Sequence, residues 1–398
     1  MTSRFATAVT VLAIGVLVGC GGGGGGTESP TPTTSVSVTP AMSSTPSTSM
    51  TPTPVPSVTP PSVVPLAWAV GGRTVLESED GGLTWSLEMQ AQVNAVEFVD
   101  RMVGWIAGAT TAGGHLFHTT DGGLHWRDEI ANAPSPSPLL FDVAVVDARH
   151  AVAVGSENGF LHPEDFHRGP PVAIVTNDAG ATWQHARLEG VDPERFKEVE
   201  LGSVCITATG TGLAAGTDVN TFVGTLALLT HDAGTSWMNI TDRLPPVLLA
   251  KVACVGESDL WFAGGTSYLL HSADGGETWT DLSATVSSGL YIQAVRFRDP
   301  LVGWLAGDDP SHRLLALATT DGGQHWQEHV LAEGVGETGI GLDFLGQRVI
   351  VVAQDLHPSS IPRSSFGLSF TTVDGGTTWT ETVHPEPIDA LWDVTLVP

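Results

Sequence analysis

Four carboxylates and two cations occupy corresponding places in a repeated apolar pattern, and together they could do chemistry. The acids are Glu97, Asp142, Asp343 and Asp393, and the cations are Lys251 and Arg296. Paired carboxylates can act as acid and base, as in glycoside hydrolysis, and clustered charges shift one another's pKa values. The same groups would also suit a solvated channel of balanced charges. Two interpretations therefore stay open, a ligand or metal site and an inert polar channel.

These six residues are located by aligning seven apolar strands. Apolar side chains at alternate positions are expected to pack inside the sheets, and the residues between them to face a central channel. The first apolar position holds Val96, Val143, Val204, Val252, Val295, Leu342 and Val394. The position two residues later holds Phe98, Val145, Ile206, Cys254, Phe297, Phe344 and Leu396. On this alignment the channel is wet and is lined by the four acids and two cations.

A turn motif, Ser/Thr-x-Asp-Gly/Ala-Gly-x-x-Trp, recurs seven times from residue 66 onward. Its aspartates are Asp80, Asp121, Asp178, Asp232, Asp274, Asp321 and Asp374. Successive motif tryptophans are 41, 57, 54, 42, 47 and 53 residues apart, and such periods predict the blades of a β-propeller. The carboxylate is expected to accept local backbone N–H bonds. Ala179 and Ala233 replace the first glycine, so only the second glycine is expected to be indispensable.

The turn motif resembles the Asp-box (BNR) repeat of bacterial neuraminidases, and its seven copies cover 66–398. The first blade, from Leu66, lacks an innermost strand, which the C-terminal run 391–397 supplies. We therefore expect an all-β, seven-bladed propeller of four-stranded blades, with the ring closed by the C-terminal strand in the first blade. All twelve tryptophans then have structural roles, and none is left as a platform for sugar stacking.

The cysteines and two loops bear on disulfide bonding and metal binding. Cys205 maps to the channel face and Cys254 to the buried face of adjacent blades, so we expect free thiols, because opposite-facing side chains cannot form a disulfide. The loop that carries His162, Asp165 and His167 is interpreted as surface rather than as a metal site. The acidic pair Asp308-Asp309 could hold calcium loosely. No metal site and no cofactor is predicted.

Sialidases share the Asp-box, but their chemistry requires three arginines, a tyrosine nucleophile and an acid. This chain has two tyrosines, Tyr268 and Tyr291, and only Arg296 lies near either of them in the alignment. A non-enzymatic role is therefore favoured. A glycoside hydrolase or glycan-binding module remains the alternative, because a pair of catalytic carboxylates leaves no sequence motif.

Charge and the N-terminal sequence restrict the location. The chain has 16 Lys+Arg and 43 Asp+Glu, and a net charge of −27 excludes binding to nucleic acid by phosphate neutralisation. Residues 1–19 predict a signal peptide, and 17–20 resemble a bacterial lipobox with Cys20 as the lipidated residue. Residues 20–65 predict a glycine run and a disordered Thr/Ser/Pro tether. We expect an exported monomer, lipid-anchored to the outer face of the cytoplasmic membrane or to the outer membrane.

The propeller region as a whole resembles the photosystem II stability/assembly factor family. The likeness rests on Gly-Trp-x-Ala-Gly strands followed by the turn motif, as in 103–108 and 119–126, and on the lipobox. It implies a non-enzymatic scaffold that binds a protein partner during assembly of a membrane complex. Family members in oxygenic phototrophs have an arginine-rich face, whereas basic residues here are few and scattered. The partner expected from these observations is a protein or glycan of the cell envelope.

Overall fold

The computed structural model describes residues 64–110, 113–134, 138–157, 169–218, 225–333, 339–356, 365–384, 388 and 390–398. The chain divides into two compact units, 1–59 and 60–398, and the described residues belong to the second unit. The predicted signal peptide, Cys20 and tether lie outside the described residues. So does the loop with His162, Asp165 and His167.

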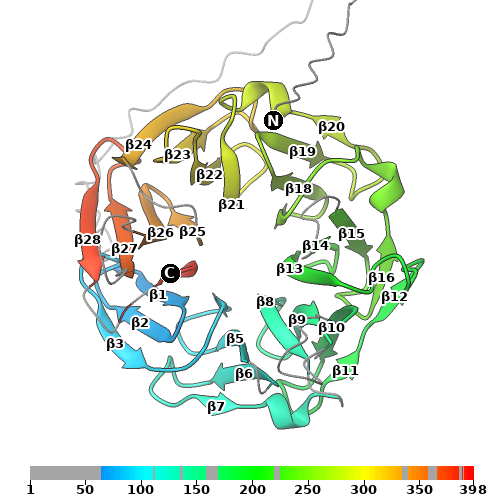
Figure 1. Cartoon of the computed structure of the whole chain (residues 1–398). Coiled ribbons are helices and arrows are strands. Elements are labelled where there is room, and N and C mark those ends of the chain that lie inside the picture. The colour runs from blue at the N-terminus through cyan, green and yellow to red at the C-terminus, as the bar shows by residue number, and fades with distance from the viewer. Residues whose placement is uncertain are drawn as a thin grey trace, which may run out of the picture. The chain divides into compact units, whose positions relative to one another are not determined.

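Seven sheets stand in a ring around a central channel, so the prediction of an all-β, seven-bladed propeller is confirmed (Figure 1). From the channel outward, blade 1 contains β29 (Asp393–Val397), β1 (Leu66–Gly71), β2 (Thr74–Ser78) and β3 (Ser86–Met89). Blade 2 contains β4 (Ala95–Phe98), β5 (Gly104–Thr110), β6 (Gly113–Thr119) and β7 (Arg127–Asp128). Blade 3 contains β8 (Leu139–Val145), β9 (Ala151–Ser156), β10 (Pro171–Thr176) and β11 (Gln184–His185).

The remaining four blades follow the same order. Blade 4 contains β13 (Val199–Ile206), β14 (Gly212–Asp218), β15 (Thr225–Thr230), β16 (Ser236–Asn239) and β12 (Arg187–Glu189). Blade 5 contains β17 (Lys251–Val255), β18 (Asp259–Gly264), β19 (Tyr268–Ser272) and β20 (Thr280–Asp281). Blade 6 contains β21 (Tyr291–Phe297), β22 (Gly303–Asp308), β23 (Arg313–Thr319) and β24 (Gln327–Glu333). Blade 7 contains β25 (Gly341–Leu345), β26 (Arg348–Leu356), β27 (Ser365–Thr372) and β28 (Thr380–His384).

The ring closes in blade 1, as predicted, because β29 pairs with β1 and places Val70 opposite Asp393. Blade 4 departs from the predicted four strands. The segment before it forms β12, which runs parallel to the outer strand β16 with Leu188 opposite Trp237. Among the described residues, three short 3₁₀ helices follow outer strands, η1 (Ile130–Asn132), η2 (Thr241–Arg243) and η3 (Ser283–Thr285).

The turn motif has the expected hydrogen bonds in every blade. In blade 2 the Thr119 hydroxyl donates to Asp121 Oδ1 at 3.0 Å, and the His125 N–H donates to the same oxygen at 2.9 Å. The first-glycine position is left-handed even where it holds alanine, with φ 59° at Ala179. The second glycine is more constrained, because a Cβ at Gly123 would overlap the ring of Trp68. This geometry explains why only the second glycine recurs in all seven copies.

The hydrophobic core lies between the blades, in seven clusters that each join two neighbours. The sheets stack face to face around the ring, so alternate side chains of an inner strand point toward the preceding and the following blade. Val204 packs with blade 3, for example, and Cys205 packs with blade 5. The expectation that the intervening residues face the channel is therefore wrong for Ala144, Cys205 and Ala253, which pack against the following blade.

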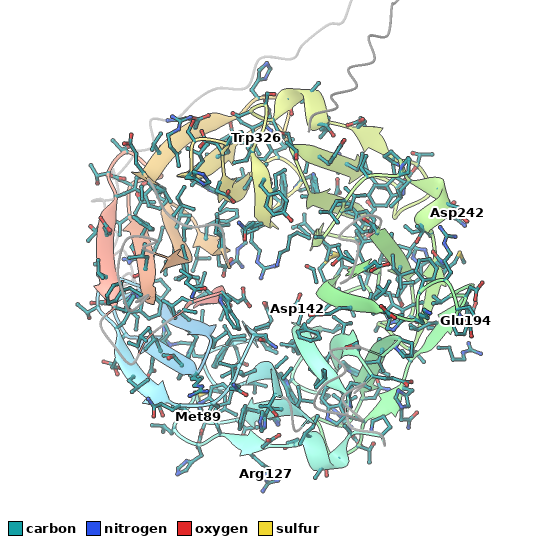
Figure 2. All side chains as sticks on the ribbon, in the orientation of Figure 1. Met89, Arg127, Asp142, Glu194, Asp242 and Trp326 are labelled. Atoms are coloured by element: carbon teal, nitrogen blue, oxygen red, sulfur yellow. A yellow bond between two sulfur atoms is a disulfide. The ribbon has the colours of Figure 1, made fainter. Side chains whose placement is uncertain are left out.

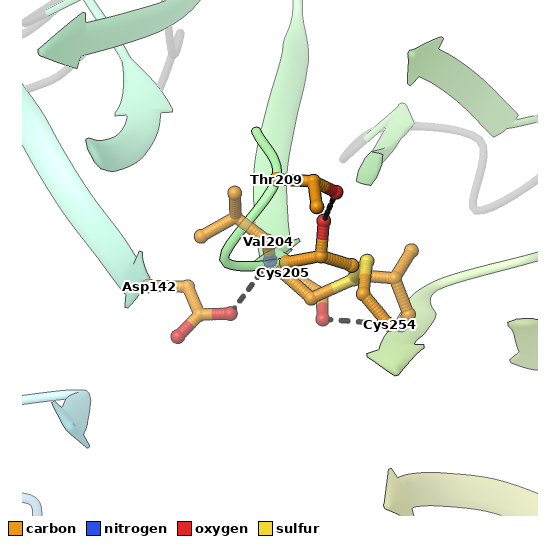
Figure 3. The surroundings of a disulfide bond; sticks show 8 residues. Asp142, Val204, Cys205, Thr209 and Cys254 are labelled. Carbon is orange, nitrogen blue, oxygen red and sulfur yellow. Dashed lines mark hydrogen bonds between the residues drawn. A yellow bond between two sulfur atoms is a disulfide. The ribbon is translucent and has the colours of Figure 1, made fainter. Parts of the chain in front are cut away.

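The expectation of free thiols is wrong for the same reason. Cys205 and Cys254 form a disulfide between the inner strands of blades 4 and 5, with Cα atoms 5.6 Å apart (Figure 3). Cys205 points forward from its blade and Cys254 points back from the next. Because the two side chains lie on opposite faces of neighbouring blades, they point toward each other, and the two sulfur atoms meet.

Candidate functional site

The central channel has a hollow at each end, and the six predicted channel residues lie around these hollows. The first, here called the Trp392 mouth, is a cavity of about 260 Å³ where the inner strands begin. It is lined by Asn94, Asp142, Lys251, Gln293, Arg296, Trp392 and Asp393, among others. The second, here called the Glu97 mouth, is about 270 Å³ where these strands end. It is lined by Glu97, Asp142, Arg296, Arg298, Asp343 and Pro398, among others.

Asp142 and Arg296 line both hollows, so they lie where the two ends of the channel meet. Figure 2 shows Asp142 on the side of the ring that borders the central opening. Each of the four acids and two cations lines one or both hollows. The partners of the acids, however, could not be foreseen.

Three side chains connect the inner strands of neighbouring blades by the same kind of hydrogen bond, in which a side-chain oxygen accepts a backbone N–H of the next blade. Asp142 Oδ2 accepts the N–H of Val204 at 2.7 Å, and Asp393 Oδ2 accepts the N–H of Val96 at 3.0 Å. The third is Ser203, whose hydroxyl accepts the N–H of Val252 at 3.2 Å. Each acceptor precedes the first apolar position of its strand, and each donor holds that position in the following blade. An inner strand has no further strand to pair with, so these side chains satisfy its free backbone donors.

Asp343 makes a related connection with a partner that the alignment missed. Its Oδ2 accepts the N–H of Leu396 in blade 1 at 2.7 Å. The guanidinium of Arg298 donates to both carboxylate oxygens, at 2.7 and 2.8 Å, and also to the carbonyl of Phe344. Arg298 lies one residue beyond β21, outside the aligned positions. The sequence signal that could have identified Arg298 is its position just after the strand, two residues beyond Arg296.

Burial raises the pKa of Glu97, Asp142 and Asp393. It raises the pKa of Glu97 to about 7, with Arg296 opposing the rise and the acids Asp343 and Asp393 adding to it. Burial likewise raises the pKa of Asp142 to about 6, and Asp393 adds to that rise. Burial also raises the pKa of Asp393. Glu97 and Asp142 therefore exchange protons near neutral pH.

Arg296 is the cation at the centre of this network. Burial disfavours its charge, but nearby carboxylates, Asp393 first, outweigh that effect and raise the pKa of the guanidinium. Its Nη2 lies 3.8 Å from Asp393 Oδ1. The result is a network of mutually neutralised charges, in which acids serve mainly as acceptors for backbone N–H groups and arginines.

In the described part of the chain, no group of three or more His, Cys, Asp or Glu side chains gathers that could hold a metal ion. The acidic loop considered for calcium is occupied by internal donors. Arg313 Nη2 lies 2.7 Å from Asp309 Oδ2, and Asp308 Oδ1 accepts the side-chain amide of Gln293 at 2.8 Å. The described residues also include no helix long and apolar enough to cross a membrane.

Trp392, which the sequence pattern assigns to the closing strand, also lines a hollow of the channel. It lies just before β29, is partly exposed, and lines the mouth that bears its name. The register of β8, β13 and β21 shifts at Phe141, Gly202 and Gln293, as at a β-bulge, and all three residues line the same mouth. Bulges re-aim side chains in this way next to functional sites. A sequence alignment without gaps could not show them.

Comparison with known proteins adds sequence relatives to this geometry. The chain is 24% identical over 266 residues to the photosystem II assembly lipoprotein Ycf48 of Synechococcus sp. (strain CC9902), covering 64% of this chain and 69% of the relative. It is 21% identical over 284 residues to the chloroplastic photosystem II stability/assembly factor HCF136 of Arabidopsis thaliana, covering 60% and 69%. Its homologues are photosystem II assembly factors. No protein-family model matches the chain.

Solved structures share the fold. A structure of YCF48 bound to a D1 peptide has a TM-score of 0.52 at 21% identity, covering 72% of this chain and 85% of that one. A GH74 xyloglucanase from Xanthomonas campestris has a TM-score of 0.53 at 15% identity, covering 79% and 46%. At these identities the likeness extends to the propeller architecture alone.

Proposed function

We propose that this chain is a non-enzymatic propeller scaffold that binds a protein partner and acts in the assembly of a membrane complex. The observation that carries the proposal is the engagement of Asp142, Asp343 and Asp393 as acceptors between blades. These bonds give three of the four channel acids a structural role, and Glu97 is the fourth. Homology to photosystem II assembly factors supports the same role.

The proposal includes tethering to the cell envelope through a lipid on Cys20, because 17–20 resemble a lipobox and one relative is described as a lipoprotein. A Cys20→Ser variant tests this part. The wild-type chain should fractionate with membranes and incorporate labelled fatty acid, and the variant should do neither. Equal membrane association of both chains would contradict tethering through Cys20.

Affinity capture tests the scaffold role. The full chain is cross-linked in native envelopes, its partners are identified by mass spectrometry, and the leading partner is purified and tested for direct binding. The same preparation is assayed against a panel of chromogenic glycosides. A directly binding membrane-protein partner without glycoside turnover is the expected result. Turnover without a direct partner would contradict the proposal.

Glycoside hydrolysis is the second candidate function, and one observation favours it. The pKa of Glu97, about 7, suits a general acid near neutral pH. The xyloglucanase with the same architecture shows that such propellers can serve glycosidases. If any glycoside is turned over, Glu97→Gln should abolish that turnover while the chain stays folded.

A further inference from the structure

Trp392 stands between two hollows on one face of the propeller. One hollow is the Trp392 mouth on the axis, and the other is a cavity of about 220 Å³ lined by Arg73, Gln92 and Ala109, among others. The side chain is partly exposed, as are five of the seven turn-motif tryptophans, but Trp392 is the one that lines these two hollows. Trp392 is thus placed to offer a ring surface to a bound molecule.

The indole is held in position by its surroundings. The backbone N–H of Trp392 donates to the carbonyl of Val70 at 2.7 Å, which fixes the chain where it enters β29. Gly339 lies so close to the ring that a Cβ there would overlap it. A large aromatic group that is already ordered loses little conformational entropy on binding, which is typical of interface hot spots.

Side-chain amides lie around the same mouth. Asn94 Nδ2 donates to the carbonyl of Leu140 at 2.8 Å, and Gln293 Nε2 donates to Asp308 Oδ1 at 2.8 Å. One bond orients each amide, and an amide has donor and acceptor capacity beyond one bond. Fixed amides of this kind complement the N–H and C=O groups of a peptide main chain.

Neither sign of charge dominates the mouth. Lys251 and Arg296 lie among the acids Asp142, Glu200 and Asp393. A strongly acidic or strongly basic ligand would therefore meet groups of its own sign there, and charge alone would give little affinity. An aromatic ring with amides fits an uncharged segment better.

We propose that Trp392 is the aromatic anchor of the partner-binding surface, and that the partner presents an extended, uncharged peptide segment with an apolar side chain against the ring. This inference rests on the proposed function and adds the location and the chemistry of the contact. The amides of Asn94 and Gln293 bind the main chain of the segment. The contact is therefore insensitive to salt.

The test is selection of a random 12-residue peptide phage library on the full chain, followed by affinity measurement with synthetic copies of the enriched peptides. Trp392→Ala should weaken binding about tenfold or more, and Trp392→Phe should retain most of it. The control is Leu124→Ala, which removes a large apolar side chain that lies outside the mouth and is 78% exposed. This control should bind like the wild type. Thermal unfolding of each variant must match the wild type.

Several outcomes separate the possibilities. Peptides that lose affinity with Trp392→Ala, and whose Kd changes less than about threefold between 50 and 500 mM NaCl, support the inference. Peptides that bind Trp392→Ala equally would overturn the anchor and leave the scaffold role standing. A strong loss of affinity in salt would overturn the uncharged segment. If no peptide is enriched, or if the chain binds only oligosaccharides on an array, the inference that a peptide occupies the mouth would be overturned.

Discussion

The carboxylate of Asp142 accepts the backbone N–H of Val204 at 2.7 Å across the interface between blades 3 and 4. The bond joins two inner strands that no other strand connects, and Asp393 and Ser203 repeat it at two further interfaces. The ring is thus held together near the channel by polar side chains as well as by the apolar clusters farther out.

Removal of this acceptor should destabilise the propeller. Asp142→Ala leaves the buried N–H of Val204 without a partner, at a cost of about 1–3 kcal/mol in the free energy of unfolding. Asp142→Asn keeps an acceptor oxygen and should lose much less. Urea unfolding of the three proteins measures the difference. Equal losses in the two variants would show that the charge, rather than the hydrogen bond, matters here.

Ionisation of the buried Glu97 should lower the free energy of unfolding as the pH rises. Burial raises its pKa from 4.5 to about 7, so the folded state holds a proton that the unfolded state has released between these values. The stability linked to this group is full below pH 4.5 and is lost as the pH rises through 7. Glu97→Gln should therefore be more stable than the wild type at pH 8, by up to about 3 kcal/mol. Unfolding curves at pH 5 and 8 check this, and an equal difference at both pH values would refute it.

His384 should lower the free energy of unfolding as the pH falls. Burial lowers its pKa from 6.5 to about 4, and its Nε2 lies 3.0 Å from the hydroxyl of Ser369. Its contribution is full above pH 6.5 and is lost as the pH falls toward 4, because only the unfolded state gains a proton in that window. His384→Gln should flatten the decline in stability between pH 6.5 and 4.5. Chemical unfolding across that range measures the slope, and an unchanged slope would contradict the assignment.

Two adjacent glycines of one turn motif offer a matched pair. Gly375 has φ +70°, and a Cβ added there would have no neighbouring atom within 4 Å, so Gly375→Ala should cost about 1–2 kcal/mol for the left-handed backbone alone. At Gly376, φ is +90° and a Cβ would lie 2.8 Å from His329 and 3.1 Å from Trp304. Gly376→Ala should therefore lower the melting temperature clearly more than Gly375→Ala. Similar melting temperatures would show that packing at the second glycine is not the constraint.

The disulfide predicts sensitivity to reduction. Cys205 and Cys254 are 49 residues apart, and closing such a loop stabilises the folded state by roughly 2–4 kcal/mol. Peptide mapping without reductant should recover the linked pair, and the double Ser variant should unfold at lower temperature in oxidising buffer. Recovery of two free thiols from protein purified without reductant would contradict the bond.

Much of the fold could be predicted from the sequence, because each blade repeats the same local signals. Asp121 and its six counterparts mark the turns between strands. The C-terminal strand forms the innermost strand of blade 1, which the sequence before Leu66 does not supply. The disulfide could not be predicted, since the alignment treated alternate faces as channel and interior. In a ring of stacked sheets they face two different blades, which is why Cys205 and Cys254 meet.

The site could be predicted only in part. The positions of Glu97, Asp142 and Arg296 followed from periodicity, since charged residues in apolar strands are found near solvent. The roles of the acids depend on backbone donors in other blades, such as the N–H of Leu396 for Asp343, and periodicity carries no information on these. Gln293 and Trp392 reach the mouth through a bulge and a strand entry, which interrupt the repeat.

Equilibrium binding between the full chain and its purified envelope partner tests the central claim most directly, with glycoside hydrolysis assayed on the same sample. The account predicts saturable binding of a membrane-protein partner and no turnover. Glycoside turnover that is lost in Glu97→Gln, with no saturable partner binding, would contradict it and make the channel an active site.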